Sequence, residues 1–228
     1  MEAFGEGLWL VDGPIVEVAG FRYPTRMTVI KLADEGLLIC SPVALAPPLQ
    51  AEVEALGEVR WLVAPNSLHH VFLKDWQGAY PNAQIFAPPG LRKKRPDIRF
   101  DEDLTGHAPS AWAPDVDQVI VGGNLITSEV VLFHRPSGTV IFTDLIQHFA
   151  PGWFTGWRAV VAKLDRMTAP QPEVPQKFRN AFINRSAARK AIRKILDWPF
   201  DKVVMAHAPP VRSDGRAFIA RAFGWLGR

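Results

Sequence analysis

Three short apolar segments, each followed by a residue type that can bind a metal ion, constrain the fold of this chain most. They are Trp61–Ala64, followed by His69 and His70; Thr139–Thr143, followed by Asp144; and Val203–Ala206, followed by His207. Each segment is short, partly β-branched and ended by a turn or polar residue, which is typical of a buried strand. In α/β proteins, sites form beyond one end of the strands, so these side chains are expected to meet.

We therefore predict one metal site built from His69, His70, Asp144 and His207. Three imidazoles and one carboxylate suit Zn²⁺ best, and they also suit Fe, Mn, Ni or Co. Four bound ligands would make a closed structural zinc site, whereas three would leave a position for water. Each residue also has an ordinary structural interpretation, as a helix cap or a loop contact, in which case the chain binds no ion.

Three further residues are weighed for this site. Glu129 opens a predicted strand, and His148 lies four residues beyond Asp144, so one helical turn would put His148 and Asp144 on one face. Either Glu129 or His148 could complete a rival ligand set. His134 lies within a predicted strand before a turn, which favours a structural role.

Length and composition indicate one soluble domain over residues 1–228. Apolar residues make up 48% and charged residues 21% of the chain, as in ordinary globular proteins. No apolar stretch approaches the roughly 20 residues of a membrane span, and no signal-like segment opens the chain, so we expect a cytoplasmic protein with no membrane partner. The single cysteine, Cys40, excludes an internal disulfide and lies in an apolar run typical of a buried, inert thiol.

Charge is divided unevenly along the chain. Residues 1–150 carry a net charge of −7 and residues 151–228 carry +10. A basic third could attract nucleic acid. The basic residues of Ser186–Asp197 alternate with apolar ones at helical spacing, however, and this is typical of the solvated face of an amphipathic helix. We therefore do not expect nucleic acid as a partner.

The predicted elements run in a mixed order, with strands grouped in two parts of the chain. The expected strands are Leu8–Val11, Thr28–Leu32, Leu37–Cys40, Val59–Ala64, Gln84–Ala87, Val116–Val121, Thr127–His134, Thr139–Thr143 and Lys202–Ala206. The expected helices are Pro47–Leu56, Val71–Tyr80, Trp157–Met167, Gln176–Phe182, Ser186–Asp197 and Asp214–Leu226. Asp12–Pro14 is expected to form a turn, Ser186 to cap its helix, and Gly90–Trp112 to be an irregular surface excursion.

Aromatic residues gather near the loops that should surround the strand ends. They are Trp76, Trp112, Trp153, Phe154 and Trp157. They could line an apolar substrate pocket, and filling of the core or a dimer surface explains them as well.

The order of elements and the residues after the strands resemble the metallo-β-lactamase superfamily, whose fold is an αββα sandwich of two mixed β-sheets. That family carries an H-x-H-x-D-H loop, a later G-H, a G-D and a final G-H. Here Pro65 and Ser67 stand where the first two histidines belong, His69 at the aspartate and His70 at the last histidine, while Asn124 or Leu125 occupies the place of the later histidine. Thr143-Asp144 matches the G-D step and Ala206-His207 the final G-H. The strings PNSLHH, APPGLRKKRPD and HRPSG also resemble a branch known only as domain of unknown function 4336.

This resemblance implies that one of the family's two ion sites has lost its ligands. The second site keeps four candidate donors, at His69, His70, Asp144 and His207. The implied activity is a single-metal hydrolase acting on an ester, amide, thioester or phosphoester of a small molecule. The alternative is a non-catalytic binding or assembly module on the same fold, and a homo-oligomer fits either. Loss of half of a two-metal site argues against phosphodiester cleavage.

Overall fold

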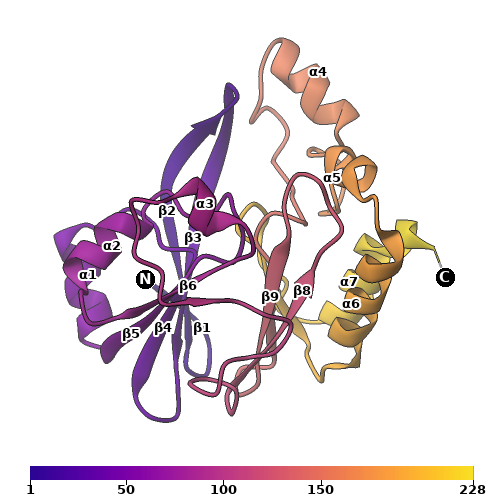
Figure 1. The fold of residues 1–228 in the computed structure, drawn as a ribbon. Helices are drawn as coiled ribbons and strands as arrows, with labels where there is room; N and C mark the ends of the chain where they lie inside the picture. Colours follow the sequence, from indigo (N-terminus) through magenta and orange to yellow (C-terminus); the bar gives the residue numbers. More distant parts are fainter. Residues whose placement is uncertain (228) are drawn as a thin grey trace.

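The computed structural model describes residues 1–227, and in it two β-sheets pack face to face with helices on their outer faces (Figure 1). The first sheet has the strand order β1-β2-β3-β4-β5-β6-β7. Its strands are β1 (Glu2–Gly5), β2 (Leu8–Val18), β3 (Phe21–Lys31), β4 (Gly36–Cys40), β5 (Glu58–Val63), β6 (Gln84–Ala87) and β7 (Glu102–Asp103). Pairing is antiparallel from β1 to β4 and parallel from β4 to β7, so the sheet is mixed.

The second sheet is also mixed and has the order β11-β10-β9-β8. Its strands are β8 (Val116–Val121), β9 (Glu129–His134), β10 (Thr139–Ile141) and β11 (Lys202–Val204). β8, β9 and β10 pair antiparallel, whereas β10 and β11 run parallel.

Helices cover the outside of both sheets. On the side of the first sheet lie α1 (Pro47–Glu54), α2 (Leu73–Ala79) and α3 (Leu91–Lys94), and on the side of the second lie α6 (Arg185–Asp197) and α7 (Gly215–Ala222) (Figure 1). α4 (Trp157–Leu164) and α5 (Gln176–Ala181) lie at one end of the sandwich, and the 3₁₀ turn η1 (Gly224–Leu226) follows α7. Within residues 1–227, no helix combines the length and the hydrophobicity that crossing a bilayer requires.

Alternating side chains of the strands build three apolar layers. In β4, Leu37 and Ile39 pack toward the helices, whereas Leu38 and Cys40 pack toward the other sheet. β9 repeats this pattern, since every residue from Glu129 to His134 is buried. A sheet buried on both faces needs an apolar residue at nearly every position, which is why these strands read as continuous apolar runs. The predicted αββα sandwich is confirmed.

Parallel strand pairs bring distant chain segments to one edge of the sandwich. β4 and β5 run side by side and end at Cys40 and Val63, and β10 and β11 end at Ile141 and Val204. The loops that follow these ends carry the polar residues singled out in the sequence. The topology therefore places them around a common opening.

Two local predictions are wrong. Asp12–Pro14 does not end the first strand, because β2 continues to Val18 through an irregularity between Gly13 and Val16. The cap of α6 is Asn184 instead of Ser186, since the Asn184 side chain accepts a hydrogen bond from the Ala187 amide. Both asparagine and serine cap helices well, and the backbone position decided between them.

Candidate metal centre

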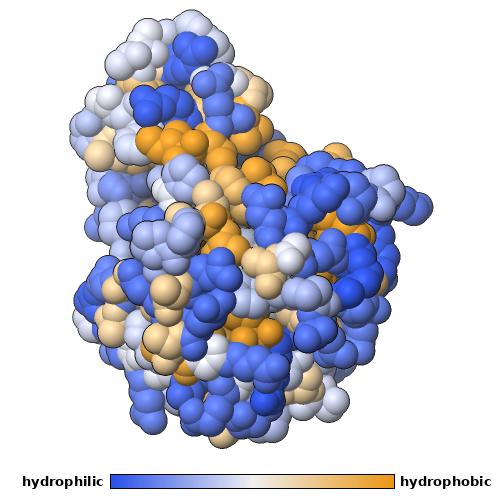
Figure 2. All heavy atoms as spheres, turned by 90° about the vertical axis from the view of Figure 1, so that its left-hand side faces the viewer, coloured by the Kyte–Doolittle hydropathy of each residue, from blue (hydrophilic) through white to orange (hydrophobic). Residues whose placement is uncertain are grey.

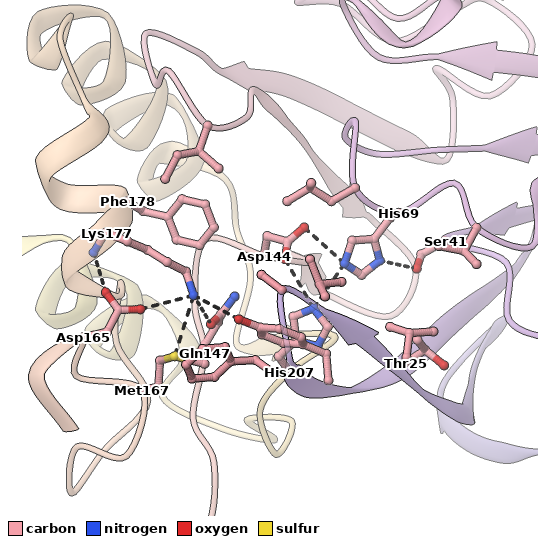
Figure 3. Close-up of a pocket in the computed structure, with 18 of the residues that line it drawn as sticks. Thr25, Ser41, His69, Asp144, Gln147, Asp165, Met167, Lys177, Phe178 and His207 are labelled. Carbon is pink, nitrogen blue, oxygen red and sulfur yellow. Dashed lines mark hydrogen bonds and ion pairs between the residues drawn. The ribbon is translucent and has the colours of Figure 1, made fainter. Parts of the chain in front are cut away.

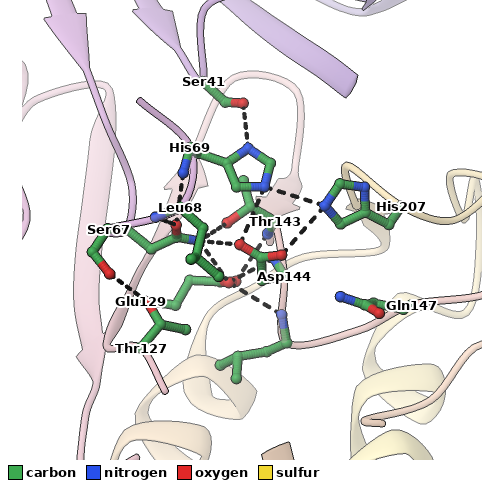
Figure 4. Close-up of polar contacts among 12 residues, drawn as sticks. Ser41, Ser67, Leu68, His69, Thr127, Glu129, Thr143, Asp144, Gln147 and His207 are labelled. Carbon is green, nitrogen blue, oxygen red and sulfur yellow. Dashed lines mark hydrogen bonds and ion pairs between the residues drawn. The ribbon is translucent and has the colours of Figure 1, made fainter. Parts of the chain in front are cut away.

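His69, Asp144 and His207 converge at the shared strand ends (Figure 4). The Nε2 atoms of His69 and His207 lie 3.3 Å apart. Asp144 Oδ2 lies 3.2 Å from His69 Nε2, and Asp144 Oδ1 lies 3.3 Å from His207 Nε2. The loops after β5, β10 and β11 thus each contribute one side chain that can bind a metal ion, and the three ligand atoms lie within 4.8 Å of one another.

The His69 ring is oriented by Ser41, the residue that follows β4. Ser41 Oγ lies 2.7 Å from His69 Nδ1, and it also donates a hydrogen bond of 3.0 Å to the Arg26 carbonyl. Since the single Ser41 proton is donated to the Arg26 carbonyl, the Ser41 hydroxyl accepts a hydrogen bond from His69 Nδ1–H. In the neutral ring, the lone pair of His69 Nε2 then faces Asp144 and His207.

Ser41 has a backbone conformation that is unusual for a residue with a side chain. Its φ is 58°, in the left-handed region, and its amide donates to the Val63 carbonyl at the end of β5. Such a conformation costs of order 1 to 3 kcal/mol and persists only where surrounding contacts enforce it. The sharp turn directs the hydroxyl toward His69.

The His207 ring is held by the backbone of the first sheet. Its Nδ1 lies 2.8 Å from the Pro24 carbonyl, which can only accept, so Nδ1 carries the proton. Arg26 fixes the same loop by donating to the Met205 and Ala208 carbonyls at 2.8 and 2.7 Å. The lone pair of His207 Nε2 therefore also points at the cluster. His207 thus holds its loop against a backbone group, as the structural interpretation of this residue predicts. The bond uses Nδ1, whereas Nε2 faces Asp144.

Asp144 is fixed by Asn66, which is fully buried. Asn66 Nδ2 donates to Asp144 Oδ2 at 2.7 Å and to Thr143 Oγ1 at 2.9 Å. Asn66 Oδ1 accepts from the amides of Leu68 and His69 at 2.8 and 3.0 Å. One amide side chain thereby connects the His69 loop with the Asp144 loop.

Glu129 fixes the loop that carries Asp144. Its carboxylate accepts hydrogen bonds from the backbone amides of Thr143 (2.9 Å), Asp144 (2.7 Å) and Leu145 (3.1 Å). Glu129 is therefore a positioning residue for Asp144, and it lies outside the group of converging ligand atoms.

Electrostatics in the cluster favour a bound cation. Burial disfavours a charged Asp144, yet the two histidines lower its pKa well below the usual value. Burial also disfavours a charged His69, but Asp144, with a smaller contribution from Glu129, raises the pKa of this ring. Burial lowers the pKa of His207. The carboxylate of Asp144 thus attracts a positive charge, either a proton on His69 or a metal ion that would take its place.

His70 lies outside the cluster. Arg95 donates to His70 Nδ1 at 2.8 Å and to the His70 carbonyl at 3.2 Å. Burial, followed by the charges of Lys94 and Arg95, lowers the pKa of His70 to about 4. Of the four residues predicted from sequence, the structure brings three together and turns His70 to the other side of the loop.

The other candidates are placed as follows. His148 contributes its backbone amide to the His207 carbonyl, but its side chain is not among the converging ligands. His134 lies at the far end of β9 and contacts Ser137. Of the interpretations of the five aromatic residues, filling of the core holds for Trp76 and Trp112, which are fully buried, and none of the five lines the cavity beside the cluster.

Sequence reasoning missed Ser41 and Asn66. Ser41 follows an apolar strand, and this is the same signal that singled out Asp144 and His207. In the sequence, Pro65-Asn66 indicates only a turn. Asparagine often bonds to backbone amides two or three residues later, which is what Asn66 does here, but its bond to Asp144 joins distant segments and leaves no local signal.

A match to a family model shows the family of this chain. A family model described as "Domain of unknown function (DUF4336)" matches residues 6–153. The chain belongs to this family. No curated protein matches the sequence.

Solved structures with the same fold are metallo-β-lactamases and related proteins. The FIM-1 metallo-β-lactamase from Pseudomonas aeruginosa, solved in a mono-zinc form, is 12% identical, with a TM-score of 0.64 over 97% of this chain and 92% of that one. A metallo-β-lactamase from Erythrobacter litoralis is 14% identical, with a TM-score of 0.65 over 97% and 94%. The Flv1 flavodiiron core from Synechocystis sp. PCC6803 is 11% identical, with a TM-score of 0.64 over 97% and 59%. At these identities the likeness shows a shared metallo-β-lactamase fold.

Proposed function

We propose that this DUF4336 protein is a metal-dependent hydrolase whose single divalent ion is held by His69 Nε2, Asp144 and His207 Nε2. Zn²⁺ is the first candidate, and Fe, Mn, Ni and Co suit the same donors. The observation that carries the proposal is the convergence of three side chains from three separate loops, whose nitrogen and oxygen atoms lie 3.2 to 3.3 Å apart in pairs.

The outer contacts of these side chains fit a metal site. Metal-binding histidines usually donate their second ring proton to a carbonyl or another acceptor, and this orients the lone pair. His69 meets this condition through Ser41, and His207 through Pro24. Two lone pairs and a carboxylate facing one another repel unless a proton or a metal ion lies among them.

The three side chains also line a cavity, so a small molecule can reach them. A divalent ion at this place supplies Lewis acidity and makes water a stronger acid. Asn66 holds Asp144 Oδ2, Glu129 fixes the Asp144 backbone, and Ser41 fixes the His69 ring. These contacts preorganise the donors, which is the contribution a protein makes to such chemistry.

The donor set favours one ion over two. Pro65 and Ser67 stand where the family's first two histidines belong, and neither offers a nitrogen ligand. Asn124, at the place of the third, donates to the Phe178 carbonyl at 2.9 Å. Without a second ion to clamp a phosphodiester, ester, amide or thioester hydrolysis is the favoured reaction class.

The second candidate is a non-catalytic binding module that keeps the cavity without the ion. The raised pKa of His69 supports it, because a protonated ring would balance the charge of Asp144 without an ion. The two candidates differ in whether purified protein takes up metal.

The test is elemental analysis after metal reconstitution and desalting, on the parent protein, His69→Ala, His207→Ala and the matched control His70→Ala. We expect about one equivalent of metal in the parent and in His70→Ala, and little in the other two. Circular dichroism checks that each variant is folded.

Equal trace amounts in all four proteins would favour the binding module. Loss of metal in His70→Ala as complete as in His69→Ala would contradict the proposed ligand set. Hydrolysis of an ester panel by the reconstituted parent, absent in folded His207→Ala, would support the catalytic part of the proposal.

A further inference from the structure

A cavity of about 340 Å³ opens directly beside the His69, Asp144 and His207 cluster (Figure 3). Pockets for small ligands usually measure roughly 300 to 1,000 Å³, so this one suits a ligand of modest size. The cluster occupies part of its wall. A molecule bound in the cavity would therefore place one end next to the three donor atoms.

The remaining walls are mostly apolar and come from separate segments. Val18 and Phe21 come from the β2–β3 hairpin, Leu68 and Phe72 from the loop after β5, and Phe178 from α5. The hairpin is held over the cavity by the α4 region, since Phe21 packs edge-on against Phe154 and Trp157. The cavity is therefore a hydrophobic passage that ends at the polar cluster of His69, Asp144 and His207.

The charged groups along the passage neutralise each other. Lys177 Nζ lies 3.2 Å from Asp165 Oδ2 and 3.3 Å from the Tyr23 hydroxyl, and Figure 3 draws the contact between Lys177 and Asp165. The same ammonium lies 5.5 and 5.4 Å from the ring centres of Tyr23 and Phe178. Among the described residues that line the cavity, Lys177 and Asp165 are the charged side chains apart from the cluster itself. An anionic head group would have to compete with Asp165 for Lys177.

Aliphatic side chains at the cavity mouth are exposed to solvent. Val18 is 54% exposed, Val71 51%, Ile126 42% and Val161 40%, and they come from four separate parts of the chain. Figure 2 shows hydrophobic side chains forming a band across the upper part of one face, between hydrophilic surfaces. Grouped exposed apolar side chains indicate a binding surface, because covering them removes apolar area from water.

We propose that this cavity binds the hydrocarbon chain of an uncharged carboxylic ester, with the ester carbonyl at the His69, Asp144 and His207 cluster. The proposal deepens the hydrolase function and rests on it for the reaction. In that reaction the oxygen of water bonds to the acyl carbon, and the bond from this carbon to the alcohol oxygen breaks. One water proton ends on the released alcohol, and the products are a carboxylic acid and an alcohol.

Binding can be tested without the reaction. The probe is a series of straight-chain 1-alkanols from butanol to decanol, titrated into metal-depleted protein by isothermal calorimetry. Each added methylene group that leaves water should increase the affinity about fourfold until the cavity is full. An affinity that does not change with chain length would overturn the proposal.

Matched pairs of exposed residues sharpen this test. Val161→Gln and Ile126→Gln place an amide at the cavity mouth and should reduce decanol affinity several-fold. Their neighbours Val160 (60% exposed) and Leu125 (71% exposed) do not line the cavity, so Val160→Gln and Leu125→Gln should leave the affinity unchanged. Equal losses within each pair would contradict the assignment.

The outcomes separate this proposal from the metal proposal. An alkanol affinity that rises with chain length in a protein that takes up no metal would support the hydrocarbon site and contradict the hydrolase proposal. Normal metal uptake with no chain-length dependence would do the reverse. A dimer that dissociates in Val161→Gln, again without chain-length dependence, would assign the mouth to an interface between two copies and overturn the proposal.

Discussion

Two buried histidine clusters can be compared in this molecule. One is the site cluster of His69, Asp144 and His207. The other is a core cluster of His134, Ser137 and Thr139, in which Ser137 Oγ lies 2.8 Å from His134 Nδ1 and donates to Thr139 Oγ1 at 2.9 Å. Both are built from loops and strand ends, and in both the imidazole side chains are largely buried.

The two clusters differ in how their polar atoms are arranged. The hydrogen bonds of the core cluster run in a line, and burial lowers the pKa of His134 to about 4, so the ring stays neutral. In the site cluster, three acceptor atoms face a common point beside a cavity. We infer that convergence around a carboxylate, more than the burial of a histidine, distinguishes a candidate ligand site from a structural cluster.

The largest expected effect on stability concerns Asn66→Asp. This change puts a third buried carboxylate beside Asp144 and Glu129 and removes the amide proton that Asp144 accepts. An uncompensated buried charge costs about 3 to 5 kcal/mol. Chemical denaturation should show this loss in the free energy of unfolding. Asn124→Asp, in a loop whose asparagine bonds only to backbone groups, is the control and should cost less than half as much. Equal losses in Asn66→Asp and Asn124→Asp would contradict the prediction that the buried carboxylates Asp144 and Glu129 make position 66 sensitive to a further charge.

Metal addition should stabilise the folded protein through the site cluster, and the core cluster should not contribute to this stabilisation. At a free Zn²⁺ concentration 100 times the Kd, binding adds about 2.7 kcal/mol. For a chain of this length, that raises the Tm by about 5 to 10 °C. The measurement is thermal unfolding with and without Zn²⁺. His207→Ala should abolish the shift, whereas His134→Gln should keep it, and a shift that survives in His207→Ala would place the ion elsewhere.

Replacing the serine of each cluster gives a smaller effect. Ser41→Ala leaves His69 Nδ1 without its acceptor, and the loss of such an outer partner lowers metal affinity about 10- to 100-fold. Ser137→Ala makes the same change beside His134 and should leave metal affinity unchanged. Competition with a chelating dye measures both. If Ser41→Ala binds metal as tightly as the parent, the orientation of His69 by Ser41 is irrelevant to the site.

A further prediction concerns the acid sensitivity of the core cluster. His134 is protonated near pH 6.5 in the unfolded chain but only near pH 4 in the folded one. Its contribution to stability is therefore present above about pH 6.5 and is lost as the pH falls toward 4. His134→Gln should reduce the loss of stability measured by urea denaturation over this range. The exposed His107→Gln serves as the control, and an identical pH slope in both variants would contradict the prediction.

Much of the fold follows from strand patterning. The predicted bounds of Gln84–Ala87 and Val116–Val121 are those of β6 and β8. Apolar runs buried on both faces are recognised easily, because nearly every position must be apolar. Asp12–Pro14 lies within β2 instead of forming a turn, because glycine and proline occur at irregular strand positions as well as in turns.

The site was predictable only to the level of the loops. His69 and His70 are adjacent, and which of them faces Asp144 depends on the turn set by Asn66 and on Arg95 from a later helix end. The Asn66 contact is local, but the Arg95 contact joins His70 to a residue 25 positions later in the sequence. A residue after a strand can thus be assigned to the right edge of the sheet, whereas the direction of its side chain depends on tertiary contacts.

The central claim is that His69, Asp144 and His207 hold one ion. Its most direct test is a crystal structure of the Zn²⁺-reconstituted protein with anomalous data collected at the zinc edge. The account predicts a single strong peak about 2.0 to 2.2 Å from His69 Nε2, an Asp144 oxygen and His207 Nε2. A peak bound by His70, or no peak among these three side chains in a zinc-saturated crystal, would contradict it.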